Sequence, residues 1–266
     1  MKPSLSTVML GLCLVACAPQ AAEPPPKPAA KAEPAPEAKP AAKADLGTLL
    51  KLSTRYAGKG DSAKASRYAS LAVKQYPEQP DAWAILGLTE AQAGKLAEAV
   101  ASYEKSLALG QKKREVFEQL ASVYDIQKRY AEAVRVYESY LELDPSDPVM
   151  LHQMGLTLLG TQDYKRAIEH LLAAKKALSS SEVPAELYID LGYAYIITDN
   201  WPRARENLGQ VFDPGKQNPM PIQLVFNLVS AMTQPSQALE LIDTFGEQPP
   251  TPQLSKIRSQ VAEQAQ

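Results

Sequence analysis

The strongest constraint on the fold is a repeat of 34 residues that runs through most of the chain. When the sequence is cut every 34 residues from Leu46, with three extra residues before the fifth segment, six segments align. The twentieth residue of every segment is then alanine: Ala65, Ala99, Ala133, Ala167, Ala204 and Ala238. A period of this length is typical of an array in which each small unit buries its apolar face against its neighbours. The sequence therefore predicts one repeat array, with its core spread along the chain.

Each segment is predicted to form two helices. Gly and Pro fall between amphipathic stretches, and apolar residues recur at helical spacing without strand-like alternation. A small residue at position twenty allows the second helix to cross the first closely. Position eight is expected to face it and is also small in five segments, as Ser53, Gly87, Ala121, Gly155 and Gly192, whereas the sixth segment has Phe226. Large apolar side chains at positions four and seven are predicted to fill the core.

These positions resemble the tetratricopeptide repeat family. The pattern is clearest in the second segment, with Trp83, Leu86, Gly87, Ala99 and Tyr103. The resemblance implies an all-α fold, a right-handed superhelix (α-solenoid) of about six helix pairs over residues 46–252. The repeats are then 46–79, 80–113, 114–147, 148–181, 185–218 and 219–252. Residues 253–266 are predicted to form a cap helix, because Leu254, Ile257 and Val261 share one face and solenoid ends need a polar outer surface.

The first seventeen residues combine a basic start with an apolar run that ends in a cysteine. Lys2 gives a basic start, Leu5 to Val15 is mostly apolar, and the run ends in Leu14, Val15, Ala16 and Cys17. This resembles a lipobox, which implies a signal peptide over 1–16 and lipidation of Cys17. The alternative is an ordinary secretory signal cleaved near Ala18, with Cys17 discarded. Because Ala18 and not Asp follows Cys17, the sorting rule of such lipoproteins predicts the cell outer membrane.

Residues 17–45 are predicted to be a disordered tether. From Ala18 to Ala44 there are eleven Ala and eight Pro, with no aromatic or β-branched residue. Such a segment cannot bury enough apolar surface to fold. Its proline density favours an extended chain that reaches roughly 80 Å at about 3.1 Å per residue. It is predicted to act as a spacer, and binding of its lysines to the cell wall is a second interpretation.

Composition argues against several classes of function. The 28 Lys and Arg against 30 Asp and Glu are too balanced for the basic footprint of a nucleic-acid binder. Both cysteines, Cys13 and Cys17, precede the repeats, so the repeats contain no disulfide and no cysteine metal site. His152 and His170 are the only histidines, and no metal-ligand spacing, phosphate loop or nucleophile elbow occurs. We expect no catalytic residues, metal, cofactor or small-molecule substrate, and no enzymatic activity.

The family resemblance also implies where a partner binds. Positions two, five, nine and twelve of each first helix line the concave wall in this family. In the third repeat they are acidic or polar, as Glu115, Glu118, Ser122 and Asp125. In the fourth and fifth repeats they are mainly apolar. We expect these residues to hold an apolar helix or extended segment of a protein partner: Leu156, Leu159, Ile189, Tyr193 and Ile196, with His152 beside them. Alternatively, the C-terminal repeats close over these side chains or self-associate.

The combined features resemble lipid-anchored outer-membrane proteins with tetratricopeptide repeats. Among them are the pilotins of type IV pilus assembly and the equivalent lipoproteins of the Flp pilus system. This resemblance implies a scaffold at the periplasmic face that helps to assemble an envelope machine, with secretin or pilus components as partners. The alternative is a lipoprotein adaptor that regulates peptidoglycan synthases or hydrolases, which the long tether favours.

Overall fold

The computed structural model describes residues 44–179, 181–212 and 218–265, and these residues form thirteen helices and no β-strand. The predicted signal peptide, Cys17 and nearly all of the tether lie outside the described residues. The helices are α2 (Leu46–Ala57), α3 (Ser62–Gln75), α4 (Pro80–Gln92), α5 (Leu96–Ala108), α6 (Arg114–Ile126), α7 (Tyr130–Leu141), α8 (Pro148–Gly160), α9 (Tyr164–Ala177), α10 (Ala185–Ile197), α11 (Trp201–Val211), α12 (Ile222–Ala231), α13 (Pro235–Phe245) and α14 (Pro252–Gln264).

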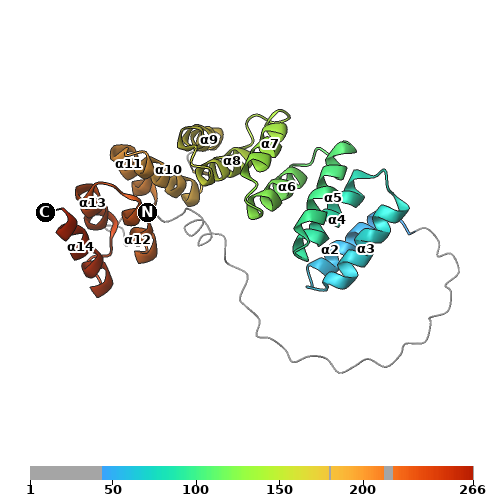
Figure 1. Ribbon diagram of the computed structural model, residues 1–266, viewed down its shortest axis with the longest axis horizontal. Helices are drawn as coiled ribbons and strands as arrows, with labels where there is room; N and C mark the ends of the chain where they lie inside the picture. The colour runs from blue at the N-terminus through green and yellow to red at the C-terminus, as the bar shows by residue number, and fades with distance from the viewer. Residues whose placement is uncertain (1–43, 180, 213–217, 266) are drawn as a thin grey trace, which may run out of the picture. The chain divides into compact units, whose positions relative to one another are not determined.

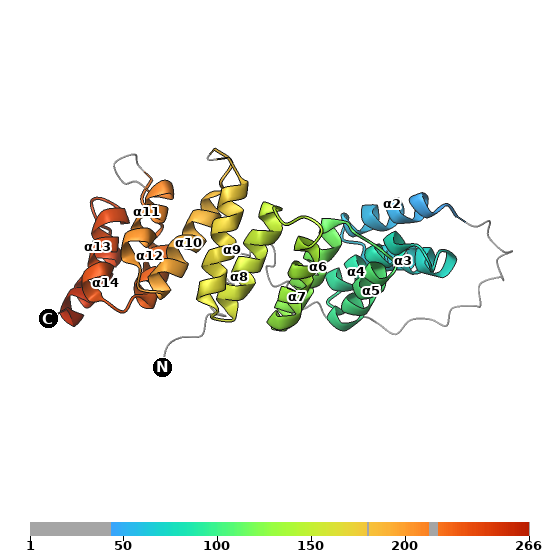
Figure 2. The same ribbon diagram turned by 90° about the horizontal axis from the view of Figure 1, so that it is seen from above.

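The chain divides into two compact units, an N-terminal unit up to Gln111 and a C-terminal unit from Lys112. In the N-terminal unit, α2 packs against α3 and α4 against α5, and α3 contacts α4 (Figure 1). In the C-terminal unit, α6 to α11 form three further pairs, and each pair contacts the next (Figure 2). Each unit is therefore a stack of helix pairs that follow one another in sequence order.

The helices begin where the 34-residue register places them. Five of the six first helices start on the first residue of their repeat, and all six second helices start at position seventeen. Local chemistry explains several of these starts. The side chains of Asp61, Asp163 and Asn200 each accept a hydrogen bond from a backbone N–H of the helix that follows. Pro80 and Pro148 occupy the first helical position, where proline's missing N–H costs nothing.

The turn inside each of the first five pairs has one geometry. Position fifteen has a positive φ in all five, as Gly60, Gly94, Lys128, Gln162 and Asp199. The N–H of the next residue donates to a carbonyl five residues earlier, for example Arg129 to Tyr124 at 2.8 Å and Asp163 to Leu158 at 3.1 Å. This is the Schellman pattern, in which one left-handed residue ends a helix and satisfies its last carbonyls.

Close approach of the two helices explains the small residues at positions eight and twenty. All six alanines at position twenty are buried. A Cβ added to Gly155 or Gly192 would lie 2.7 Å from the side chain of Leu171 or Leu208, which is at position twenty-four. The Ser53 hydroxyl donates to the carbonyl of Ala65 at 2.9 Å. Position eight therefore faces the second helix as predicted, but its tightest side-chain contact is position twenty-four rather than the alanine.

The sixth pair departs from the pattern. Its first helix was expected from Pro219, but α12 begins at Ile222. Pro219 and Pro221 restrict the residues before them to extended backbone, and the Met220 N–H donates to the Phe245 carbonyl at 2.6 Å instead of entering a helix. Phe226, at the position that the other repeats keep small, is 51% exposed. A large side chain here cannot enter the helix crossing, and α12 makes few contacts with α13.

The C-terminal helix covers the end of the C-terminal unit. Helix α14 packs against α13 and buries Leu254 and Val261. The Arg258 guanidinium donates to both carboxylate oxygens of Asp243 on α13, at 2.7 and 2.9 Å. The predicted all-α array of six helix pairs followed by a cap helix is confirmed.

Candidate protein-binding surface

Three first helices of the C-terminal unit, α6, α8 and α10, carry the residues expected to bind a partner. We call positions two, five, nine and twelve of these helices the α6–α8–α10 surface. Helices α8 and α10 contact each other, and direct hydrogen bonds join α6 to α8 and α8 to α10. The apolar side chains of Leu156, Ile189 and Tyr193 are partly buried, and Val149 is 37% exposed. These four residues give the surface its accessible apolar area.

Two of the five apolar residues that were expected to hold a partner are buried within the protein itself. Leu159 is 1% exposed and Ile196 is 6% exposed. Both stand at position twelve, where Asp125 of α6 reaches Thr157 of the next first helix at 2.8 Å. Position twelve therefore lies close to the following repeat, and a large apolar side chain there becomes part of the core. Any partner that reaches this surface meets Leu156, Ile189 and Tyr193 before these two residues.

A polar pair lies within the apolar part of the surface. His152 Nε2 on α8 and Asp190 Oδ2 on α10 are 2.7 Å apart, and both side chains are 17% exposed. Because the hydrogen bond satisfies the imidazole and the carboxylate, neither side chain is an unpaired polar group on an apolar wall. The pair joins repeats four and five and holds the two helices in register, so His152 contributes to the structure of the surface.

Asp125 is the most perturbed acidic group of the surface. Its Oδ2 accepts a hydrogen bond from the Thr157 hydroxyl at 2.8 Å, and its Oδ1 is buried with no hydrogen-bond partner among the described residues. Burial raises the pKa of the Asp125 carboxyl to about 6, although the bond from Thr157 acts in the opposite direction. A buried acceptor without a donor costs free energy, so the protein holds this carboxyl at some cost in stability.

Tyr193 is the one tyrosine among the twelve positions of the surface. Burial raises the pKa of its phenol to about 12, and the nearby Tyr164 adds to this effect. The ring is therefore neutral at any physiological pH. It offers a partner an apolar face and a hydroxyl that can donate or accept one hydrogen bond.

The surface changes character from α6 to α10. Glu115 and Ser122 on α6 are exposed, and Glu118 is partly exposed. None of the twelve surface positions is Lys or Arg. The surface thus combines negative charge on α6 with apolar side chains on α8 and α10.

Helix α4 of the N-terminal unit is less suited to bind a partner. On α4 the four positions are Asp81, Ala84, Leu88 and Ala91, all partly buried. The Asp81 carboxylate accepts a hydrogen bond from Gln111 Nε2 at 2.7 Å. Small side chains and an occupied carboxylate make α4 a weaker candidate for partner binding than the α6–α8–α10 surface.

In the described part of the chain, no group of three or more His, Asp or Glu side chains is placed to hold a metal ion. The described helices also include none that is long and apolar enough to cross a membrane. His170 lies on α9, and burial together with the positive charge of Arg166 lowers its pKa. His152 and His170 are thus held on different helices in different surroundings.

Two residues of the site were missed by sequence reasoning. Asp190, the partner of His152, and Thr157, the partner of Asp125, stand at positions six and ten of their repeats. A signal was available in the sequence, since both polar residues interrupt largely apolar helices. A contact between successive first helices, however, depends on the offset between repeats, which the 34-residue period alone does not specify.

Comparison with known proteins supports the repeat assignment. Models of the tetratricopeptide repeat family match residues 50–114 and residues 115–147. A comparison with curated protein sequences finds no match. The two matched segments span the second and third repeats, where the family pattern is most complete, and much of the first.

Several solved structures share this fold. A tetratricopeptide repeat protein from Parabacteroides merdae is 21% identical with a TM-score of 0.61, covering 83% of this chain and 87% of its own. Pseudomonas aeruginosa pilF is 16% identical with a TM-score of 0.58, covering 81% and 97%. MamA from Desulfovibrio magneticus is 22% identical with a TM-score of 0.56, covering 64% and 94%.

The helix pairs, their register and these matches define the class of protein. The fold is the all-α tetratricopeptide-repeat solenoid, and residues 50–147 carry recognisable repeats of that family. Solenoid proteins of this kind present extended concave surfaces that they use to bind other proteins. The chain is accordingly a protein-binding scaffold in its general function.

Proposed function

We propose that this protein is a lipid-anchored scaffold at the periplasmic face of the outer membrane, where it assists assembly of an envelope machine. The machine we favour is a type IV or Flp pilus or its secretin. One observation carries the binding part of the proposal: apolar side chains of Leu156, Ile189 and Tyr193 are partly exposed beside an acidic helix in the C-terminal unit. Accessible apolar side chains gathered beside a charged rim are typical of a protein interface.

The composition of the surface indicates the partner's chemistry. A segment with apolar side chains facing α8 and α10 and a positive charge facing α6 would match it. Charge of this kind mainly speeds association and selects among partners, whereas the apolar contacts supply most of the affinity.

The anchoring part rests on the sequence. The run that ends in Cys17, followed by a proline-rich segment of 27 residues, resembles the start of an outer-membrane lipoprotein. Pseudomonas aeruginosa pilF has the same fold over 81% of this chain, which is compatible with the pilus assignment.

Affinity capture from detergent-solubilised envelopes tests the binding surface. The variant Leu156→Asp/Tyr193→Asp places two charges on the apolar part of the surface and should abolish recovery of the partner. Leu172→Asp is the matched control, because Leu172 is an apolar residue of α9 that is 38% exposed. Helical content, followed by circular dichroism, should be unchanged in both. Equal recovery by the surface variant and the control would contradict the proposed surface.

The identity of the captured protein separates the two candidate functions. Recovery of a secretin or pilus component supports the first. The predicted reach of roughly 80 Å for the tether favours a second role, regulation of peptidoglycan synthases or hydrolases, since it would carry the repeats toward the cell wall. Recovery of a murein enzyme that depends on Tyr193 would support this adaptor role instead.

A further inference from the structure

The first helix pair differs in charge from the rest of the protein. Residues 46–79 contain six Lys and Arg against two Asp and Glu, whereas residues 80–266 contain 17 against 24. The net charge of −2 for the whole chain hides this separation. Helices α2 and α3 therefore form a positive hairpin on a protein that is otherwise negative.

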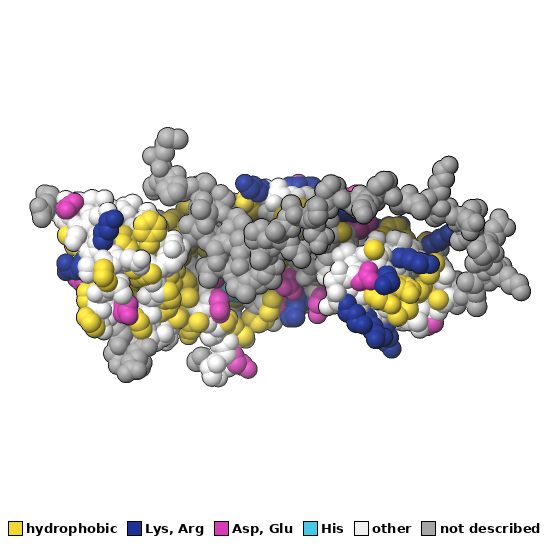
Figure 3. All heavy atoms as spheres, turned by 90° about the horizontal axis from the view of Figure 1, so that it is seen from below, with side chains coloured by type: hydrophobic (Ala, Val, Ile, Leu, Met, Phe, Trp, Pro, Cys, Tyr) yellow, Lys and Arg dark blue, Asp and Glu magenta, His cyan; other side chains and the backbone are white. Residues whose placement is uncertain are grey.

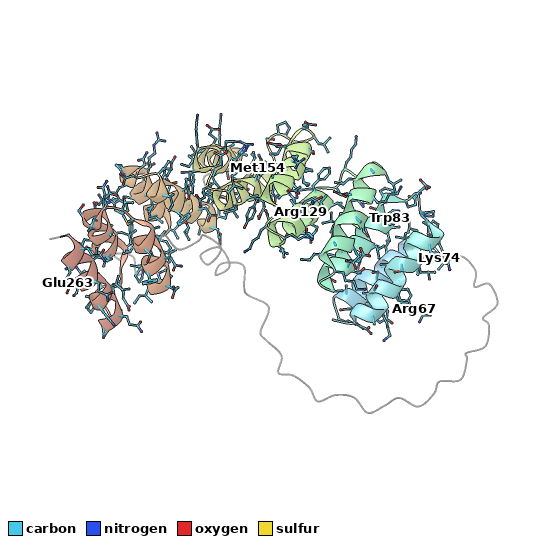
Figure 4. All side chains as sticks on the ribbon, in the orientation of Figure 1. Arg67, Lys74, Trp83, Arg129, Met154 and Glu263 are labelled. Carbon is cyan, nitrogen blue, oxygen red and sulfur yellow. The ribbon has the colours of Figure 1, made fainter. Side chains whose placement is uncertain are left out.

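The positive residues form a stripe on each helix of the hairpin. On α2 and the turn after it, Lys51, Arg55 and Lys59 are four residues apart, and on α3 the residues are Lys64, Arg67 and Lys74. Residues at these spacings share one side of a helix. All six are exposed. Figure 3 shows Lys and Arg side chains around a hydrophobic area of the N-terminal unit, at the right, and Figure 4 marks Arg67 and Lys74 along α3.

Carboxylates of the described chain do not neutralise this charge. Lys64 pairs with Asp61 at 2.7 Å, but no ion pair with another described residue involves the remaining five. Asp61 is itself occupied as the N-cap of α3. Arginines of the C-terminal unit behave differently, since five of them lie within 4 Å of a carboxylate: Arg114, Arg129, Arg166, Arg205 and Arg258. Arg55 and Arg67 are thus left available for an anion from outside.

Aromatic side chains accompany the charges. The rings of Tyr56 and Tyr68 stack with their centroids 5.6 Å apart, and the Lys64 ammonium lies 5.2 Å from the centre of the Tyr56 ring. Both tyrosines are partly buried. Tyrosine has an apolar ring with a polar tip, and for this reason it is enriched where protein meets the headgroups of a membrane.

We infer that the α2–α3 hairpin binds the anionic headgroups of a phospholipid bilayer. Exposed, unpaired cations near such a surface each contribute attraction that acts within about a Debye length. Stacked tyrosines beside the cations suit the headgroup region better than a soluble polyanion. The hairpin is also the first folded element after the predicted anchor and tether. It would supply a second, electrostatic attachment that draws the N-terminal unit back to the membrane.

Vesicle flotation tests this inference. The full chain carrying Cys17→Ser, which cannot be acylated at that position, is floated with phosphatidylcholine vesicles that contain or lack phosphatidylglycerol. We expect binding to rise strongly with phosphatidylglycerol and to fall with added salt. In the same background, Lys51→Glu/Arg55→Glu/Arg67→Glu should reduce binding to the anionic vesicles by about tenfold or more, because each basic residue contributes separately.

The matched control has the same change of charge elsewhere. Lys128→Glu/Lys165→Glu/Lys176→Glu alters three exposed lysines of the C-terminal unit and should retain most of the binding. All variants keep the same N-terminal apolar run, so a difference between them reports the hairpin. Equal loss in both triple variants, or equal binding to vesicles without phosphatidylglycerol, would refute the inference. The inference would also be refuted if the hairpin variant lost binding to peptidoglycan sacculi but kept its binding to vesicles. The hairpin would then be assigned to the cell wall.

Discussion

At the scale of single residues, the left-handed turn position shows how far this sequence departs from ideal repeat chemistry. Position fifteen is Gly60 and Gly94 in the first two repeats but Lys128, Gln162 and Asp199 in the next three, all with positive φ. A residue with a Cβ is strained in this region, while glycine is not. The repeats therefore keep the turn at some cost in stability.

Replacing Gln162 with glycine should stabilise the protein. Relief of the strained backbone outweighs the extra freedom that glycine gives the unfolded chain, and the expected gain is about 0.5–1 kcal/mol. Urea unfolding followed by circular dichroism measures it. Gln162→Ala keeps a Cβ and should give no gain. Asp199 is unsuitable for this test, because its carboxylate accepts hydrogen bonds from Gln234 at 2.9 and 3.1 Å.

Asp125 should make stability depend on pH. Its pKa is raised from 3.8 to about 6 in the folded state. Between these values the folded protein holds a proton that the unfolded chain has released, so stability falls as pH rises from about 4 to about 6 and then levels. Asp125→Asn removes this component and should be more stable than the parent protein above pH 6, by up to about 3 kcal/mol.

The pH profile of stability has an internal check. Thr157 donates to Asp125 and by itself lowers the pKa of that carboxyl. Thr157→Val should therefore move the inflection to higher pH, as followed by thermal unfolding across the pH range. An inflection that stays in place, or that survives in Asp125→Asn, would show that another group causes it.

At the scale of helices, the register explains what could be predicted. The six alanines set the register of the repeats, and this register predicted the starts of all six second helices and of five first helices. It could be found because two helices that cross closely need a small residue at the crossing, and all six alanines are buried there. The burial of Leu159 and Ile196 was missed, since the repeat period indicates the face of a helix but not how far the next repeat overlaps it. The same limit hid the contact between His152 and Asp190.

In the sixth helix pair, individual residues override the 34-residue repeat pattern. Pro219 and Pro221 delay the start of α12, and Phe226 prevents the close crossing that Gly155 and Gly192 allow. Stability at this end must then come from α13 and α14. The cap helix is thus more than a solvating cover, because it supplies α13 with the contacts that α12 does not.

Leu254→Ala should destabilise this end by about 2–4 kcal/mol. Leu254 of α14 is buried, and its removal leaves a cavity beside α13. Hydrogen exchange should increase in α12 to α14 before it increases in α6 and α7. Lys256→Ala, an exposed residue of the same helix, serves as the control and should leave exchange unchanged. A uniform increase over the C-terminal unit would indicate one cooperative unit instead.

At the scale of the whole molecule, the predicted attachments lie at one end of the chain and the α6–α8–α10 surface at a distance along it. A lipid on Cys17 and the positive α2–α3 hairpin would both act on the membrane, separated by the tether. The acidic and apolar partner surface belongs to the C-terminal unit, which has no comparable positive hairpin in its described residues. The hairpin is positive and the partner surface is negative. An anionic membrane therefore attracts the hairpin and repels the partner surface.

Cys17→Ser should abolish incorporation of labelled fatty acid, and Cys13→Ser, the other cysteine of the same apolar run, should leave it unchanged. Several acyl chains are needed for stable anchoring, because a single chain gives only marginal binding. Without them the remaining attachment is electrostatic, so fractionation should release Cys17→Ser from membranes at high salt and retain part of it at low salt. Adding Lys51→Glu/Arg55→Glu/Arg67→Glu should remove the part retained at low salt. Retention of Cys17→Ser at high salt, with label still incorporated, would mean that the anchor lies at another residue.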